Sequence, residues 1–225
     1  MLGDQPLAMN LCHWIARHAA LRPNAAAVIC EDRSFTYAQF WSAVTALSDA
    51  LAGRLNFRPG DRVAYLGYNS PELLMLLFAC ARLGCIVLPL NWRMAPPEHA
   101  AILRHAAPSA LFVEAQFTAH VESLLADIPT PLLINYDGAG PPWHAFADVV
   151  ENHGLAQPPF PEITYAAPLL LCYTSGTTGE PKGALLSQHA LFWNAVNSTV
   201  LHDLTSADHV LTVLPMFHVG GLNIQ

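Results

Sequence analysis

The sequence has 225 residues, of which 53% are hydrophobic and 12% charged, so the chain can fill a substantial core and does not resemble a disordered protein. Its formal net charge is −7, and no basic cluster is present to neutralise phosphates, which argues against nucleic-acid binding. The N-terminus lacks a secretory pattern, and the most apolar region, 73–90, is interrupted by Arg82, Gly84 and Pro89. We therefore expect a soluble cytoplasmic protein with no transmembrane segment.

Cysteine and histidine spacing gives no sign of a cross-linked or metal-bound fold. The cysteines are odd in number and contain no Cys-x-x-Cys pair, and the eleven histidines lack paired ligand spacing. We expect the thiols to be core residues and predict no structural metal. The cysteines concerned are Cys12, Cys30, Cys80, Cys85 and Cys172.

Helix-start signals alternate with short apolar runs through residues 10–135. Thr36 and Gln39 form a Thr-x-x-Gln capping box, and Ser70 followed by Pro71 begins a helix that Gly84 ends. The expected order is helix 10–21, strand 26–30, a helix from 36, strand 62–66, helix 70–84, strand 85–88, helix 97–104, strand 110–113, helix 116–126 and strand 132–135. Such alternation with short connections predicts an α/β fold with mainly parallel β-sheets flanked by helices.

The remaining elements continue this pattern beyond a glycine-rich and proline-rich loop. The segment 154–161 is rich in proline and is the best candidate for a surface linker. The expected elements are helix 143–152, strand 168–172, a glycine-rich loop, strand 184–186, a helix from 188 to about 200 capped by Ser187, and a buried strand 210–214.

The glycine-rich loop is the most informative stretch, with Tyr-Thr-Ser-Gly-Thr-Thr-Gly-Glu-Pro-Lys-Gly at positions 173–183. Its glycines allow successive N–H groups to turn onto an anion, and its hydroxyls and lysine add donors and positive charge. A polyphosphate is the natural ligand, although a mobile turn has a similar composition. A Walker-type loop is excluded because Pro181 precedes and Gly183 follows the lysine. The candidate binding residues are Thr174, Ser175, Gly176, Thr177, Thr178, Gly179 and Lys182.

Position for position, this loop resembles the signature loop of the adenylate-forming superfamily, which includes acyl-CoA synthetases, aryl-CoA ligases, luciferases and peptide-synthetase adenylation domains. Three further segments support the resemblance, and the first is the helix start at Phe35-Thr36-Tyr37. Pro89, Asn91 and Arg93 form a Pro-x-Asn-x-Arg element similar to that of acyl- and aryl-CoA ligases. The segment 214–221 is similar to the Pro-x-Phe-His-x-x-Gly element of the same superfamily.

The resemblance implies ATP-dependent activation of a small carboxylic acid to an acyl-adenylate, followed by thioester formation with CoA. In that scheme the loop holds the phosphates of ATP, with Mg²⁺ near Thr174 or Thr178. Lys182 and His218 have catalytic roles, and Phe217, His218 and Gly220 lie at the substrate. The implied fold is the N-terminal domain of an adenylate-forming enzyme, which would be incomplete in this sequence.

The chain stops at Gln225, before the family's adenine-side motif, ribose-binding Asp, hinge and lid domain. We therefore expect residues 1–225 to be an N-terminal fragment without turnover alone, partnered by a second copy or a complementary C-terminal chain. A non-catalytic partner or split-enzyme subunit that binds polyphosphate or a homologous chain is an alternative. An adenylation domain that loads a carrier protein is another, disfavoured by Asn91 and by Phe217-His218. The sequence does not specify the acid.

Overall fold

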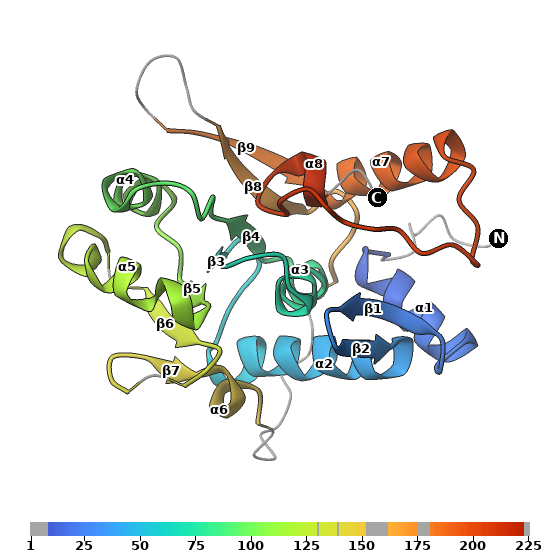
Figure 1. Ribbon diagram of the computed structural model, residues 1–225, viewed down its shortest axis with the longest axis horizontal. Coiled ribbons are helices and arrows are strands. Elements are labelled where there is room, and N and C mark those ends of the chain that lie inside the picture. The colour runs from blue at the N-terminus through green and yellow to red at the C-terminus, as the bar shows by residue number, and fades with distance from the viewer. Residues whose placement is uncertain (1–8, 130, 139, 152–161, 175–180, 223–225) are drawn as a thin grey trace.

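The computed structural model describes residues 9–129, 131–138, 140–151, 162–174 and 181–222 (Figure 1). Its centre is a seven-stranded sheet in the order β7-β6-β5-β3-β4-β8-β9, parallel except for the last pair. This confirms the predicted α/β class. The strands are β3 Arg62–Leu66, β4 Ile86–Pro89, β5 Ala110–Val113, β6 Leu132–Asn135, β7 His144–Ala145, β8 Pro168–Thr174 and β9 Lys182–Ser187.

Helices cover both faces of this sheet, so alternate residues of one strand enter different cores. In β3, Val63 and Tyr65 pack in the core beneath α2, α3 and α6, whereas Ala64 and Leu66 pack in the core beneath α4 and α5. Figure 1 shows α2 and α6 on one side of the sheet and α4 on the other. The helices are α2 Tyr37–Asp49, α3 Pro71–Leu83, α4 Pro96–Ala106, α5 Thr118–Glu122 and α6 Phe146–Val150.

The predicted helix starts are built by local hydrogen bonds. Thr36 Oγ1 accepts the Gln39 N–H at 3.2 Å, and the Gln39 side chain accepts the Thr36 N–H at 2.9 Å, which completes the capping box. Ser70 Oγ accepts the Leu73 N–H at 3.2 Å, and α3 ends at Gly84 with φ +75°. These signals act within one turn, which is why the sequence reveals them.

Other elements differ from the prediction. A short hairpin precedes α2, and its second strand was not anticipated from the sequence. The expected helix 116–126 is divided into three short helical segments, and the expected helix 143–152 begins instead with β7 and becomes helical at Phe146. The remaining elements are α1 Cys12–Leu21, β1 Ala26–Cys30, β2 Arg33–Thr36, η1 Ala50–Arg54, η2 Ala115–Phe117, η3 Leu125–Asp127, α7 Gln188–Leu201 and α8 Val219–Leu222.

The predicted buried strand 210–214 is wrong. These residues have no strand structure, and the side chains of Leu211 and Val213 are 81% and 74% exposed. Within the described part of the chain, no strand pairs with this segment. An apolar run becomes a strand only when a neighbour satisfies its backbone groups and covers its side chains.

Two further expectations concern cysteines and membranes. Four of the five cysteines are buried free thiols, and Cys30 is half-buried, which largely confirms the expected core role. Burial raises the pKa of Cys12 and Cys172 to about 11, so these thiols stay protonated at neutral pH. In the described ranges, no helix is both long and apolar enough to cross a bilayer. The predicted linker 154–161 lies outside the described residues.

Candidate functional site

The glycine-rich loop connects two adjacent antiparallel strands at the edge of the sheet. In the register of β8 and β9, Thr174 lies opposite Lys182, and both side chains are exposed. The structure therefore brings a hydroxyl and a cation together at the mouth of the loop, although they are eight positions apart in the sequence. The other candidate phosphate-binding residues, Ser175, Gly176, Thr177, Thr178 and Gly179, lie outside the described residues.

A cavity of about 840 Å³ opens beside this hairpin. The end of β4, its following loop and α4 form one wall, and the end of β8 with Pro181 forms another. Phe217 and His218 close the cavity from the C-terminal part of the chain. Three sequence-predicted elements thus meet at one hollow: the mouth of the glycine-rich loop, the Asn91 element and the Phe-His pair. The volume is that of a small-molecule site.

Aromatic side chains join the Asn91 element to the Phe-His pair. The Trp92 ring lies edge-on to Phe217 with centroids 6.2 Å apart and edge-on to Tyr68 at 5.0 Å. The Arg93 guanidinium lies over the Trp92 ring at 4.7 Å and over the Phe217 ring at 5.8 Å. Phe217 is only 7% exposed, whereas His218 beside it is exposed to solvent. Phe217 is therefore a fixed wall residue, and His218 is free to meet a ligand.

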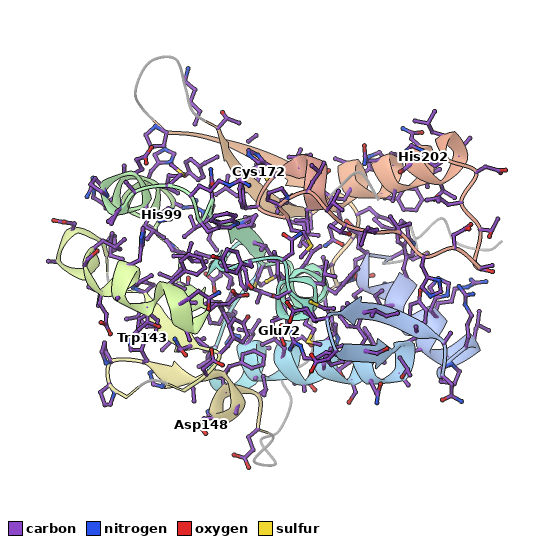
Figure 2. All side chains as sticks on the ribbon, viewed as in Figure 1. Glu72, His99, Trp143, Asp148, Cys172 and His202 are labelled. Carbon is purple, nitrogen blue, oxygen red and sulfur yellow. The ribbon has the colours of Figure 1, made fainter. Side chains whose placement is uncertain are left out.

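A histidine pair that the sequence reasoning missed holds the loop after β4. His99, labelled in Figure 2, lies buried on α4, and its Nε2–H donates to the Asn91 carbonyl at 3.0 Å. A neutral imidazole that donates from Nε2 must accept at Nδ1, so the His120 Nε2–H donates to His99 Nδ1 at 2.8 Å. Burial, followed by the effect of His120, lowers the pKa of His99 to about 4. Burial also lowers the pKa of His120, so both imidazole rings are neutral near pH 7.

Gly220, predicted at the substrate, lies in α8, outside the lining residues just described. The neighbouring glycine, Gly221, has a steric requirement of its own. A Cβ on Gly221 would lie 2.2 Å from the Pro215 carbonyl oxygen, so α8 packs against the preceding loop only with glycine there. Of the two candidate magnesium neighbours, Thr174 lines the cavity and Thr178 lies outside the described residues.

Comparison with protein families gives a match over almost the whole chain. A family model for AMP-binding enzymes matches residues 15–225. An indoleacetate–CoA ligase of Aromatoleum aromaticum is 50% identical over 218 residues, which cover 96% of this chain and 42% of the relative. A feruloyl-CoA synthase of an Amycolatopsis species is 37% identical over 216 residues, which cover 96% and 41%. Other relatives are named for fatty acids.

Solved structures show the same fold. The o-succinylbenzoate CoA synthetase of Bacillus subtilis, in complex with its acyl-adenylate intermediate, is similar with a TM-score of 0.76 and 25% identity. That similarity covers 96% of this chain and 52% of the solved chain. The chain therefore spans about half the length of that structure, and about two fifths of the curated relatives named above.

Proposed function

Because the chain belongs to the AMP-binding enzyme family, we propose that it forms the phosphate-loop and acid-binding part of an ATP-dependent acid–CoA ligase. In the first step the acid's carboxylate oxygen attacks the α-phosphorus of ATP, and pyrophosphate leaves as the acyl-adenylate forms. In the second step the CoA thiol loses its proton and attacks the acyl carbon, and AMP leaves as the thioester forms. The observation that carries this proposal is the cavity shared by Thr174, Asn91 and Phe217.

The first step brings together an anionic acid and an anionic nucleotide, so the site must hold both and offset the charge on pyrophosphate. Lys182 is exposed at the start of β9 and is suited to that second task. His218 is exposed at the cavity and can donate a hydrogen bond to the acid's carboxylate. The Thr174 hydroxyl, exposed at the end of β8, is an oxygen donor suited to Mg²⁺, which neutralises phosphate charge when bound with ATP.

We favour an acid with an aromatic ring over a fatty acid. Three of the similar proteins are named for indoleacetate, ferulate and o-succinylbenzoate, and each of these acids carries an aromatic ring. In this chain, Phe217 supplies an aromatic wall to the cavity and is fixed by Trp92 behind it. Ring stacking against such a wall favours a flat aromatic group.

The phosphate part of the proposal can be tested on the 225-residue chain because Lys182 is its single lysine. An amine-reactive acylating reagent should modify Lys182, and mass spectrometry of the peptide should show the product. Tripolyphosphate or Mg²⁺-ATP should reduce the modification rate several-fold, whereas equimolar sulfate should not. Modification of the α-amino group provides an internal control within each sample. Equal rates at Lys182 with and without polyphosphate would refute its role at the phosphate.

The activity is tested on the native protein that carries this sequence. Acid-dependent exchange of pyrophosphate into ATP should occur with indole-3-acetate or ferulate and be weaker with decanoate. Lys182→Ala should reduce exchange by about 100-fold or more, the typical loss when one preorganised charge-stabilising group is removed. Lys182→Arg, which keeps the charge, should retain more activity. An absence of exchange with every carboxylic acid tested would contradict the proposed reaction.

A further inference from the structure

The turn between β3 and α3 is tied to the segment that carries Phe217 and His218. The Asn69 Nδ2–H donates to the Leu214 carbonyl at 2.9 Å, and Asn69 Oδ1 accepts the Met216 N–H at 2.8 Å. One side-chain amide thus uses its donor and its acceptor on the same stretch of backbone, 145 positions away. Two bonds from one planar group fix both the position and the orientation of that backbone.

This pair of bonds, the Asn69 clamp, marks a change in how the C-terminal segment packs. Before it, Leu211 and Val213 are largely exposed. Met216 in the clamp and Phe217 directly after it are buried, with 5% and 7% of their surfaces exposed. The clamp therefore acts where the chain enters the cavity wall. A displacement at Met216 would carry the Phe217 ring with it.

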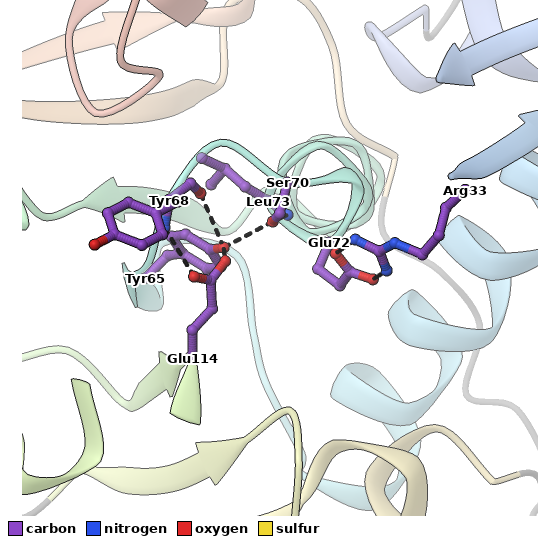
Figure 3. Close-up of polar contacts among 7 residues, drawn as sticks. All are labelled: Arg33, Tyr65, Tyr68, Ser70, Glu72, Leu73 and Glu114. Atoms are coloured by element: carbon purple, nitrogen blue, oxygen red, sulfur yellow. Dashed lines mark hydrogen bonds and ion pairs between the residues drawn. The ribbon is translucent and has the colours of Figure 1, made fainter. Parts of the chain in front are cut away.

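The turn that bears Asn69 is itself held by hydrogen bonds to Glu114 (Figure 3). Glu114, which follows β5, accepts the Tyr65 O–H at 2.6 Å and the Tyr68 N–H at 2.9 Å on separate carboxylate oxygens. Since the single Tyr65 proton goes to the carboxylate, the Ser70 O–H donates to Tyr65 Oη at 2.7 Å. Ser70 Oγ in turn accepts the Leu73 N–H of α3. The chain of bonds leaves every hydroxyl in it satisfied.

Steric and electrostatic features favour the same geometry. A Cβ on Gly67 would lie 2.5 Å from the Glu114 carboxyl carbon, so only glycine lets the carboxylate approach the turn. Burial raises the pKa of Tyr65 far above its usual value, and Tyr136 and Glu114 add to the effect. Tyr65 therefore keeps its phenolic proton at all ordinary pH values.

We propose that Asn69 is a positioning residue that holds the Phe217-His218 wall of the acid site in place, with Tyr65 and Glu114 fixing the turn that carries it. The inference that the wall faces an acid rests on the proposed function. The clamp itself rests on the bonds to Leu214 and Met216. The two parts are tested separately.

The clamp is tested by amide hydrogen exchange on the 225-residue chain, followed by NMR at the Met216 amide. Asn69→Ala should accelerate exchange at Met216 about 3- to 10-fold, as expected for loss of one protected hydrogen bond. Asn69→Asp keeps an oxygen that can accept the Met216 N–H but sets a carboxylate oxygen against the Leu214 carbonyl in place of the donor, so its exchange should lie between those of Asn69→Ala and the unchanged protein. Asn24→Ala, at an exposed asparagine before β1, is the matched control and should change nothing at Met216.

The positioning role is tested by steady-state kinetics on the native protein. Asn69→Ala should raise KM for the acid about tenfold and leave KM for ATP within twofold, whereas Asn69→Asp, which keeps one of the two contacts, should raise the acid KM by less. Equal Met216 exchange in all variants would overturn the clamp. Faster exchange with an unchanged acid KM would overturn the positioning role. If the unchanged protein uses no acid, the proposed function fails, and the exchange result still decides the clamp.

Discussion

β5 and the segment 210–214 are both short apolar runs, yet they have opposite structures. Ala110–Val113 is a strand with all four residues buried, whereas 210–214 has no strand structure and exposes Leu211 and Val213. β5 has β3 on one edge, β6 on the other and a helix-covered core on each face. The contrast shows that apolar composition predicts a capacity to form a strand, and that neighbours decide whether a strand forms.

The two runs also differ in how they bear on the site. β5 lies in the interior and supports the turn below Asn69 through Glu114, the residue that follows it. The segment 210–214 reaches the site only at its end, where the Asn69 clamp and the burial of Met216 begin. Substitutions in β5 should therefore affect global stability. Substitutions early in 210–214 should not.

The largest effect expected from this comparison is in β5. Phe112 is fully buried, and its ring centroid lies 6.1 Å from that of Tyr136 and 6.3 Å from that of Phe146. Phe112→Ala should lower the free energy of unfolding by about 3–5 kcal/mol, because it removes apolar contacts and leaves a cavity. Leu211→Ala, at a side chain that is 81% exposed, should change it by less than about 0.5 kcal/mol. Urea unfolding followed by circular dichroism measures both, and similar losses for the two variants would break the comparison.

An intermediate effect should appear when the pH is lowered. His99 lies on α4, whose buried apolar residues pack in the same core as Leu111 and Val113 of β5, and His120 and Glu98 are titratable groups near it. Its folded pKa of about 4 lies below the usual 6.5, so the unfolded state binds the proton first as the pH falls. The stability contribution is present above pH 6.5 and is lost toward pH 4, with a full size on the order of 3 kcal/mol.

Urea unfolding at pH 7.5 and pH 4.5 measures this dependence. His99→Gln keeps a donor toward the Asn91 carbonyl but cannot titrate, so it should reduce the loss of stability between the two pH values. His209→Gln, at an exposed histidine just before the segment 210–214, is the matched control and should leave the loss unchanged. An undiminished loss in His99→Gln would show that other groups cause the acid sensitivity.

A small effect is also expected where a polar contact near the surface, instead of burial, joins two elements. The Arg33 guanidinium of β2 pairs with the Glu72 carboxylate of α3 at 2.5 Å, with 47% and 18% of their side chains exposed (Figure 3). Arg33→Ala should cost less than about 1 kcal/mol, and 1 M NaCl should reduce that cost. A cost close to that of Phe112→Ala would mean that this contact contributes as much as the buried core.

Much of the fold and part of the site could be predicted from local sequence. The capping box at Thr36, the Ser70-Pro71 start of α3 and its end at Gly84 each depend on residues within one turn, so pattern alone identifies them. The alternation of strands and helices predicted a mainly parallel sheet, and the structure has one. The glycine-rich loop and the Phe-His pair were identified as site candidates because their residue order is itself the signal.

By itself, the sequence determined the α/β class, most helix starts and the family, because each is written in short patterns or in a nearly continuous match. Only the tertiary structure decided that 210–214 is not a strand, because strand formation requires a partner that no pattern within the run encodes. It also decided that His99 supports Asn91 and that Asn69 holds Met216. Asn69 and Met216 are 147 positions apart, and their contact depends on which chain segments the folded sheet brings together.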